Sequence, residues 1–218
     1  EVEKGCEKQM NHQDQIRSTV KDINLVEKRR EQMIKGAISL FKEKGFHRTT
    51  TREIAKASGF SIGTLYEYIR TKEDILFLVC DAIYDQVYQR LKATIDFQKP
   101  SIKSLLTVIE LYFRLMDEMQ DEVVIMYQEV KSLHDDVRDY VLERERDMIS
   151  MVKWVIVTCV PYDITAKDAE LIANNIFVQG QMWGFRRWAL QKQFTLEEYI
   201  EKQMHYIMLA LDIDELKD

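Results

Sequence analysis

Turn-forming residues are scarce in this chain, and their scarcity limits the folds open to it. Glycine occurs 7 times and proline 2 times in 218 residues, about 4% together, against about 12% in an average protein. A β-sheet protein of this length needs many tight turns, and glycine and proline supply the backbone conformations of most of them. The composition therefore predicts an all-α fold of long helices joined by short connections.

Hydrophobic and charged contents narrow the class of protein further. With 46% hydrophobic and 31% charged residues, the chain is too apolar for a disordered polymer and too charged for a membrane protein. Its longest apolar run, Ile75–Cys80, is far shorter than the roughly 20 residues of a bilayer span, and no secretory leader opens the sequence. Three widely spaced cysteines without a C-x-x-C pair, Cys6, Cys80 and Cys159, are expected of a cytoplasmic protein without disulfides or zinc.

Charge is distributed unevenly along the sequence. Residues 25–72 carry 11 lysines and arginines against 5 acidic residues, whereas residues 73–218 carry 16 against 27. A basic segment before an acidic body suggests that one end of the protein meets a polyanion and the rest does not. Taken alone, the pattern is equally compatible with solvated helix faces that happen to be basic.

Helical periodicity and capping signals divide the chain into nine expected helices after a polar arm over residues 1–24. Apolar residues recur at i, i+3, i+4 and i+7 in residues 34–41 and at i+4 steps from 75 to 95, which is typical of amphipathic helices. Serine and threonine N-caps precede several helices, and glycine or proline follows others. The expected helices span about 25–44, 51–57, 62–69, 72–95, 101–117, 123–133, 136–160, 166–191 and 196–211. The first three form a domain over 25–72, and the rest form a bundle over 73–218.

The segment 50–68 has the spacing of a helix-turn-helix. Ala55 is small where two helices cross closely, and Gly59 supplies the backbone of the turn between them. One half of the second helix is apolar, and the other half carries Gly63, Thr64, Glu67 and Tyr68. A glycine early in a helix costs about 1 kcal/mol relative to alanine. We expect that it lets the backbone approach DNA, because the N-terminal end of such a helix enters the major groove.

The motif Thr-x-x-x-Ile-Ala-x-x-x-Gly-x-Ser-x-Gly-Thr-Leu-Tyr-x-Tyr-x-x-x-Lys-Glu-Asp, residues 50–74, gives the chain a specific resemblance to a known family. It resembles the N-terminal domain of the tetracycline-repressor (TetR) family of one-component bacterial regulators. The match covers about residues 26–78 and departs at Ile69, where the family usually has phenylalanine. The rest of the chain is similar to the family only in length and number of helices. The resemblance implies a transcriptional regulator, most simply a repressor, with residues 73–218 as its ligand-binding and dimerisation domain.

The resemblance also implies a set of DNA contacts on a near-palindromic double-stranded operator. In chain order the candidates are Thr51, Arg52, Ile62, Gly63, Thr64, Tyr66, Tyr68 and Lys72. The first two would hold phosphates, the next three would face base edges, the tyrosines would touch phosphates or the groove wall, and the lysine would clamp the DNA backbone. Hydroxyls, cations and helix N-termini are the usual phosphate partners. The tyrosines could instead pack within the domain, and Glu67 could face either a cytosine amino group or solvent.

An effector pocket inside the bundle is a further implication of the family resemblance. Eight of the ten methionines lie at or after Met116, as do all three tryptophans, and soft methionines among aromatic residues suit an adaptable apolar pocket. The nominated lining residues are Met126, Tyr127, Val130, Met151, Trp154, Val155, Phe177 and Trp183. Residues 126–130 loosely resemble the sixth helix of family members that respond to long-chain acyl-CoA, so we expect an apolar or amphipathic effector such as an acyl-CoA or fatty acid.

The family arrangement places a homodimer interface on the last two helices. Small residues let a partner helix come close, and the expected interface residues are Phe177, Gly180, Gln181 and Gly184, followed by Tyr199, Met204, Ile207 and Leu211. Ligand entry is expected to move the helix that begins near Lys72 and so to lower DNA affinity.

No catalytic constellation is visible in the sequence. The four histidines are scattered, and no metal-ligand spacing, Walker loop, G-x-S-x-G or G-x-G-x-x-G occurs. We therefore expect no enzyme activity, no cofactor and no metal site. Two other functions stay open at this point. The helix-turn-helix could dock a protein partner instead of DNA, and carboxylates from distant helices could form an active site that spacing cannot reveal.

Overall fold

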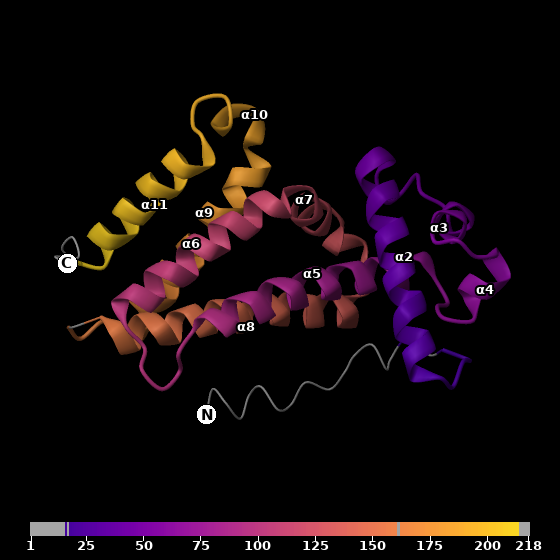
Figure 1. Ribbon diagram of the computed structural model, residues 1–218, viewed down its shortest axis with the longest axis horizontal. Helices are drawn as coiled ribbons and strands as arrows, with labels where there is room; N and C mark the ends of the chain where they lie inside the picture. The colour runs from indigo at the N-terminus through magenta and orange to yellow at the C-terminus, as the bar shows by residue number, and fades with distance from the viewer. Residues whose placement is uncertain (1–15, 17, 161, 214–218) are drawn as a thin grey trace. The chain divides into compact units, whose positions relative to one another are not determined.

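The computed structural model describes residues 16, 18–160 and 162–213, which form helices and connecting segments without a β-strand (Figure 1). The described helices are α2 (Ile23–Lys44), α3 (Thr51–Ala57), α4 (Ile62–Tyr66), α5 (Lys72–Thr94), α6 (Ile102–Glu118), α7 (Gln120–Glu129), the 3₁₀ turn η2 (Val130–Ser132), α8 (Asp135–Cys159), α9 (Ala166–Phe185), α10 (Arg187–Leu190) and α11 (Leu196–Ala210). The predicted all-α class is confirmed, and none of these helices is long and apolar enough to cross a membrane.

Side-chain caps place the starts of most helices where the sequence predicts them. A serine, threonine or aspartate side chain accepts a hydrogen bond from a backbone N–H of the first turn and so satisfies a group that the helix itself leaves unpaired. The capping residues are Asp22, Thr50, Ser61, Ser101, Thr165 and Thr195. At the opposite end of α2, Gly45 has a φ of 81°, a conformation that favours glycine and ends the helix.

Four predicted boundaries, in three of the helices, are wrong. The expected helix over 62–69 ends at Tyr66, and the expected helix over 123–133 begins at Gln120 and gives way to η2 after Glu129. The expected helix over 166–191 breaks at Arg186, where φ is −106° and ψ is 21°, and its remainder forms the short α10. The start at Gln120 lengthens the predicted helix, whereas the other three boundaries end a helix before its locally acceptable pattern ends.

The chain divides into two compact units. One comprises Glu1–Ile83 and Ile125–Leu142, and the other comprises Tyr84–Val124 and Glu143–Asp218. Helices α5, α7 and α8 each contribute residues to both units. The predicted boundary between residues 72 and 73 lies at the start of α5, but the first unit extends to Ile83 and also takes in the segment 125–142 from a distant part of the sequence.

The core of the first unit lies where α2, α3 and α4 pack together. Met33, Ile54 and Leu65 are completely buried there. A Cβ on Gly36 of α2 would lie 2.8 Å from Ser58 Oγ and 3.2 Å from the Ser58 backbone nitrogen, so only glycine allows α2 to approach the end of α3 this closely. This close packing fixes the position of the segment that leads into α4.

The core of the second unit is an aromatic cluster among α6, α9 and α11. Ring centroids lie 4.5 Å apart for Tyr112 and Phe177, and 4.9 Å apart for Trp183 and Tyr199. The Trp183 Nε1–H donates to Asp117 Oδ1 at 2.7 Å, and the Tyr199 hydroxyl donates to the Gln179 carbonyl at 2.6 Å. The rings bury their large apolar faces while their polar groups keep hydrogen-bond partners.

Candidate nucleic-acid interface

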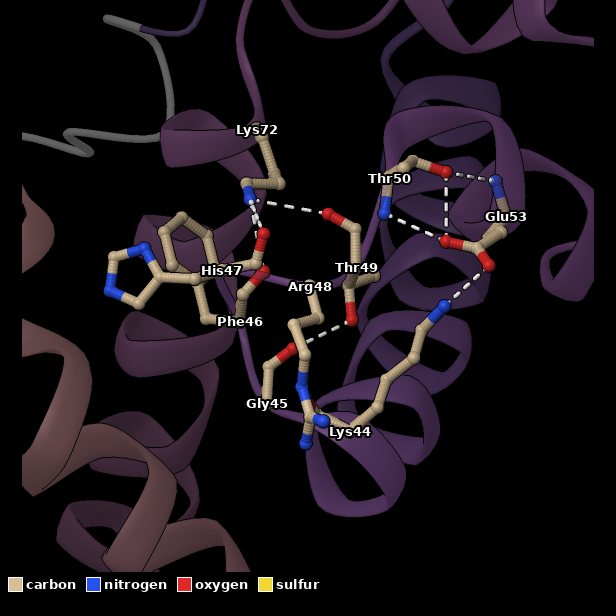
Figure 2. A network of polar contacts seen from close by, with 9 residues as sticks. All are labelled: Lys44, Gly45, Phe46, His47, Arg48, Thr49, Thr50, Glu53 and Lys72. Atoms are coloured by element: carbon tan, nitrogen blue, oxygen red, sulfur yellow. Dashed lines mark hydrogen bonds and ion pairs between the residues drawn. The ribbon is translucent and has the colours of Figure 1, made fainter.

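The start of α3 is held by a reciprocal capping box. The Thr50 hydroxyl accepts from the Glu53 N–H at 3.3 Å, and the Glu53 carboxylate accepts from the Thr50 N–H at 2.9 Å. Lys44, at the end of α2, donates to the same carboxylate (Figure 2). Hydrogen bonds from the Lys44 ammonium and from the Thr50 N–H and hydroxyl lower the pKa of the Glu53 carboxyl to about 2. The first turn of α3 is therefore fixed to the end of α2 through an ionised glutamate.

The connection from α3 to α4 is a tight turn. Gly59 adopts a φ of 81°, and the Phe60 N–H donates to the Ala55 carbonyl at 3.0 Å. Ser61 then caps α4 by accepting from the Thr64 N–H at 3.0 Å. The predicted helix-turn-helix is present, with the N-terminus of α4 presented at the surface of the first unit.

Six of the eight predicted DNA-contact residues have exposed or partly exposed side chains or backbone: Thr51, Arg52, Ile62, Gly63, Thr64 and Tyr66. The Thr51 and Tyr66 hydroxyls lie 3.1 Å apart and form a hydrogen bond that joins α3 to α4. Tyr66 is nevertheless 48% exposed. The two helices thus present one contiguous set of hydroxyl, guanidinium and apolar groups.

Gly63 is not required by the fold of the chain itself. A Cβ at this position would meet only Ser61 Oγ, at 3.6 Å, which is ordinary van der Waals contact. The residue also lacks the positive φ of Gly45 and Gly59. Because alanine favours a helix by about 1 kcal/mol over glycine, the glycine is a cost that no internal contact offsets. The bare backbone is therefore suited to close approach by another molecule.

The expectation that Tyr68 presents its ring to DNA is wrong for this conformation. The side chain is only 3% exposed, and the alternative of packing within the domain holds instead. The chain leaves α4 after Tyr66, and the Tyr68 N–H donates to the Leu65 carbonyl at 3.0 Å. This turn directs Tyr68 and Ile69 into the core. The prediction of a helix that continues to residue 69 did not indicate this.

Lys72 also lies differently from what its expected role as a clamp on the DNA backbone would require. Its ammonium donates to the carbonyl oxygens of Phe46, His47 and Thr49, at 2.9, 3.4 and 3.2 Å (Figure 2). All three belong to the loop between α2 and α3. This contact could not be predicted from the sequence, because a single basic residue at a helix start does not reveal which oxygens it will reach.

Other basic residues of the 25–72 segment also have partners inside the first unit. Arg30 is buried and donates to the Ile16 carbonyl at 2.6 Å, and the Arg48 Nε–H donates to the Lys44 carbonyl at 2.7 Å. Counting charges along the sequence therefore overstates the number of cations available to a polyanion. Arg52 is exposed on the first turn of α3 and belongs to the candidate interface.

The eight residues nominated for an effector pocket are divided between the two units. Met126, Tyr127 and Val130 belong to the first unit, where Tyr127 is half exposed. The other five are Met151, Trp154, Val155, Phe177 and Trp183 of the second unit. There Val155 and Phe177 are buried, and Trp154 stacks near Phe97 with ring centroids 5.4 Å apart.

A cavity of about 160 Å³ lies in the first unit, and none of the eight nominated residues lines it. Phe77 and Tyr140 contribute aromatic walls, and Glu73, Asp74 and Asp136 contribute carboxyl groups. Three carboxyl groups make this cavity unsuited to an acidic effector. In the described part of the chain, no group of three or more His, Cys, Asp or Glu residues is arranged to hold a metal ion.

Most residues expected at a dimer interface pack inside their own unit instead. Phe177, Gly180 and Gln181 are buried, and a Cβ on Gly180 would lie 2.4 Å from a ring carbon of Tyr112. The helix that packs closely against Gly180 is therefore α6 of the same chain. Gly184 likewise faces Gln120. On α11, Tyr199 and Ile207 are buried and Met204 is half-buried, and Leu211 at its C-cap is buried as well. The assignment of this apolar stripe to a partner is therefore wrong.

A different set of apolar residues is exposed on the last long helices. Leu171 and Val178 of α9, and Tyr206 and Leu209 of α11, are each more than half exposed. On α9 the two are seven residues apart, so they lie on the same face of the helix. Sequence periodicity missed this face because the stronger apolar stripe of each helix marks the core of the monomer.

A capped helix, a tight turn and a second helix with a bare glycine at its exposed N-terminus define a helix-turn-helix DNA-binding domain, here attached to a helical body. Comparison with known proteins supports the same class of protein. Residues 33–79 match the family described as bacterial regulatory proteins, tetR family. The chain is 30% identical, over 88% of its length and 85% of the relative's, to the HTH-type transcriptional regulator HbdR of Aromatoleum sp. strain CIB. The protein belongs to the tetR family of transcriptional regulators, a family of DNA-binding proteins and not of enzymes.

Two further similarities cover more than half of the chain. The fatty acid metabolism regulator protein of Bacillus subtilis strain 168 is 24% identical over 57% of this chain and 64% of its own. The crystal structure of a bacterial regulatory protein in the tetR family from Rhodococcus RHA1 superposes with a TM-score of 0.69 and 21% identity, covering 85% of this chain and 96% of that one. At this level of identity the superposition shows a common fold.

Proposed function

We propose that the protein is a repressor that binds a near-palindromic operator as a homodimer and is released from it by a small apolar or amphipathic effector. The observation that carries the proposal is the surface formed by α3 and the N-terminus of α4. Its glycine serves no internal packing contact, while Arg52 of α3 and Tyr66 of α4 are exposed. A basic and hydroxyl-rich rim around a bare helix N-terminus is suited to phosphates at its edge and base pairs at its centre.

On the operator, we propose that α4 lies in the major groove with Ile62, Gly63 and Thr64 toward the base edges. Ile62 is suited to packing on a thymine methyl group. Thr51, Arg52 and Tyr66 hold phosphates on either side. Two such surfaces in a symmetric dimer would read half-sites about 34–36 Å apart, one turn of the double helix.

Operator binding is tested by fluorescence anisotropy with duplexes from the DNA upstream of the protein's own gene. A specific site should bind at least about 10³-fold more tightly than a scrambled duplex at the same salt concentration. Affinity should fall steeply between about 50 and 200 mM salt, because phosphate contacts release counterions. Equal affinity for both duplexes together with a flat salt response would exclude DNA as the partner.

We propose that the dimer forms through the exposed apolar faces of α9 and α11. Leu171 and Val178 line one face, and Tyr206 and Leu209 line the other. Four large apolar side chains exposed on two helices of one unit are typical of a surface that is covered in an assembly. The position also agrees with the family arrangement that the sequence implies.

For the effector, we propose a long-chain fatty acid or its acyl-CoA, bound in the second unit among its methionines and aromatic residues. Met151 and Val155 of α8 are buried there, beside half-buried Trp154. One relative is named a fatty acid metabolism regulator, which supports this class of ligand. Binding lowers operator affinity only if the effector prefers the conformation that cannot bind DNA, and a coupling of about 1–3 kcal/mol is sufficient.

The effector is tested by mass spectrometry of solvent extracts from the purified protein and by displacement of labelled operator. A long-chain acyl-CoA, the free acid of the same chain and a short-chain acyl-CoA are compared. Release of DNA by one of the long-chain compounds but not by the short-chain one supports the proposal. Release by none of the three excludes this class of effector.

A further inference from the structure

Lys72 is the first residue of α5, and its side chain reaches back to the loop that joins α2 to α3. In Figure 2 its nitrogen lies above this loop, with dashed lines to carbonyl oxygens below it and to its right. The three acceptors are the carbonyls of Phe46, His47 and Thr49, at 2.9, 3.4 and 3.2 Å. The same nitrogen lies 4.1 Å from the centre of the Phe46 ring, within the range of a cation–π interaction.

An ammonium group has three N–H donors and no acceptor. Three carbonyl oxygens at hydrogen-bond distance therefore account for all of its donors. A phosphate contact would require the ammonium to give up at least one of these carbonyls and to leave the face of the Phe46 ring. The geometry thus favours an internal role over the phosphate contact that the sequence motif implies.

The loop that Lys72 holds is the segment that sets the start of α3. Thr49 is almost completely buried, its N–H donates to the Phe46 carbonyl at 3.1 Å, and its hydroxyl donates to the Gly45 carbonyl at 2.9 Å. Thr50, the next residue, is the N-cap of α3. The first turn of α5 is therefore connected to the first turn of α3 through one ammonium group and four loop residues.

We infer that Lys72 is a positioning residue for operator binding and not a DNA contact. It fixes the loop 46–49 and thereby orients the first turn of α3, where Thr51 and Arg52 lie. This inference rests on the proposed function of the α3–α4 surface as the DNA-binding site. It assigns the phosphate contact to Arg52, which is exposed on that turn. Loss of the lysine should therefore lower operator affinity without changing its salt dependence.

The test compares Lys72→Met with Arg52→Met in full-length protein, measuring operator affinity at several salt concentrations. Methionine retains an unbranched apolar side chain over the Phe46 ring but removes the three donors. Each lost phosphate contact reduces the slope of log K against log salt by about 0.9, or about 1.8 for a dimer on two half-sites. Arg52→Met should show this reduction. Lys72→Met should lower affinity about tenfold or more at every salt concentration and leave the slope unchanged.

A reduced slope in Lys72→Met, matching that of Arg52→Met, would overturn the inference and assign the lysine to a phosphate. The slope of log K against log salt stays informative when part of a sample is unfolded. An inactive fraction lowers the apparent affinity by the same factor at every salt concentration and leaves the slope unchanged. Lys72→Arg provides a second criterion. A planar guanidinium is a good phosphate ligand but does not match three converging carbonyls, so affinity should fall, and full affinity would contradict a positioning role.

A measurement without DNA separates this inference from the proposed function. Amide hydrogen exchange at residues 49–54 should become at least about tenfold faster in Lys72→Met, since local opening of the loop costs less free energy. It should stay at the parental rate in Arg52→Met. Unchanged exchange in Lys72→Met would refute the positioning role even if the protein bound no DNA. Faster exchange in a protein that binds no operator would refute the proposed function and leave the loop contact established.

Discussion

Two glycines of the first unit illustrate how the same residue type serves different ends. Gly36 is needed by the fold, because a Cβ there would lie 2.8 Å from Ser58 Oγ and close to backbone atoms. Gly63 has room for a Cβ, with only Ser61 Oγ at 3.6 Å. The sequence alone gives the spacing of both glycines but cannot show which of them faces the interior. The structure distinguishes the two glycines, because there is room for a Cβ atom at Gly63 but not at Gly36.

Replacing each of these glycines by alanine should therefore have opposite effects on the free energy of unfolding. Gly63→Ala should stabilise the protein by up to about 1 kcal/mol through helix propensity and weaken operator binding at least about tenfold by keeping α4 out of the groove. Gly36→Ala should destabilise it by about 1–3 kcal/mol through overpacking. Denaturant titration and fluorescence anisotropy measure the two quantities. Undiminished operator affinity in Gly63→Ala would show that the bare backbone is not in contact with DNA.

Tyr68 is the residue at which motif-based expectation and structure differ most. Its buried ring predicts that Tyr68→Ala costs about 3–5 kcal/mol of unfolding free energy. Tyr68→Phe keeps the packing, so its operator affinity should equal that of the parent, as measured by anisotropy. A loss of operator affinity in Tyr68→Phe with unchanged stability would restore the hydroxyl as a DNA contact.

At the level of elements, helix starts are predictable from sequence, while helix ends and the faces turned toward the core are less so. An N-cap such as Thr50 or Thr195 acts through atoms within three residues, and this local chemistry can be recognised in a sequence. The end of α4 depends on a core that takes in Tyr68, and the break at Arg186 depends on neighbours distant in sequence. The face of α9 that carries Gly180 packs on Tyr112 of α6, a pairing that no spacing within α9 reveals.

The capping box of α3 predicts a pH dependence of stability. The pKa of Glu53 falls from 4.5 to about 2 on folding, so its contribution is fully present above about pH 4.5 and is lost as the pH falls towards 2. Glu53→Gln should thus melt at a lower temperature than the parent at neutral pH, and the difference should shrink between pH 4.5 and 2. Calorimetry across this range measures it.

A matched control for this effect is Glu31→Gln, which removes the same charge from an exposed position of α2. Its melting temperature should follow that of the parent at every pH. A constant difference between Glu53→Gln and the parent from neutral pH down to pH 2 would show that the carboxylate does not stabilise the start of α3 through its charge.

At the scale of the whole molecule, the proposed mechanism needs two copies of the DNA-binding unit and hence a dimer. Deleting α11 cannot test the interface, because Tyr199 and Ile207 of that helix are buried in the monomer and their loss would unfold the second unit. Point substitutions on the exposed face avoid this difficulty, since Val178 and Leu209 are more than half exposed. Charged residues at such positions cost little in a monomer and much in a buried interface.

The double variant Val178→Arg with Leu209→Arg should therefore be a folded monomer, as measured by light scattering and circular dichroism. Four arginines, two from each subunit, would lose hydration in the dimer without paired carboxylates, a cost of several kcal/mol. Operator affinity should fall at least about a hundredfold, because each half-site would then be bound independently. Ile23→Lys, an exposed position of α2, should leave both properties unchanged. A dimer that persists in the double variant would place the interface on another face of the molecule.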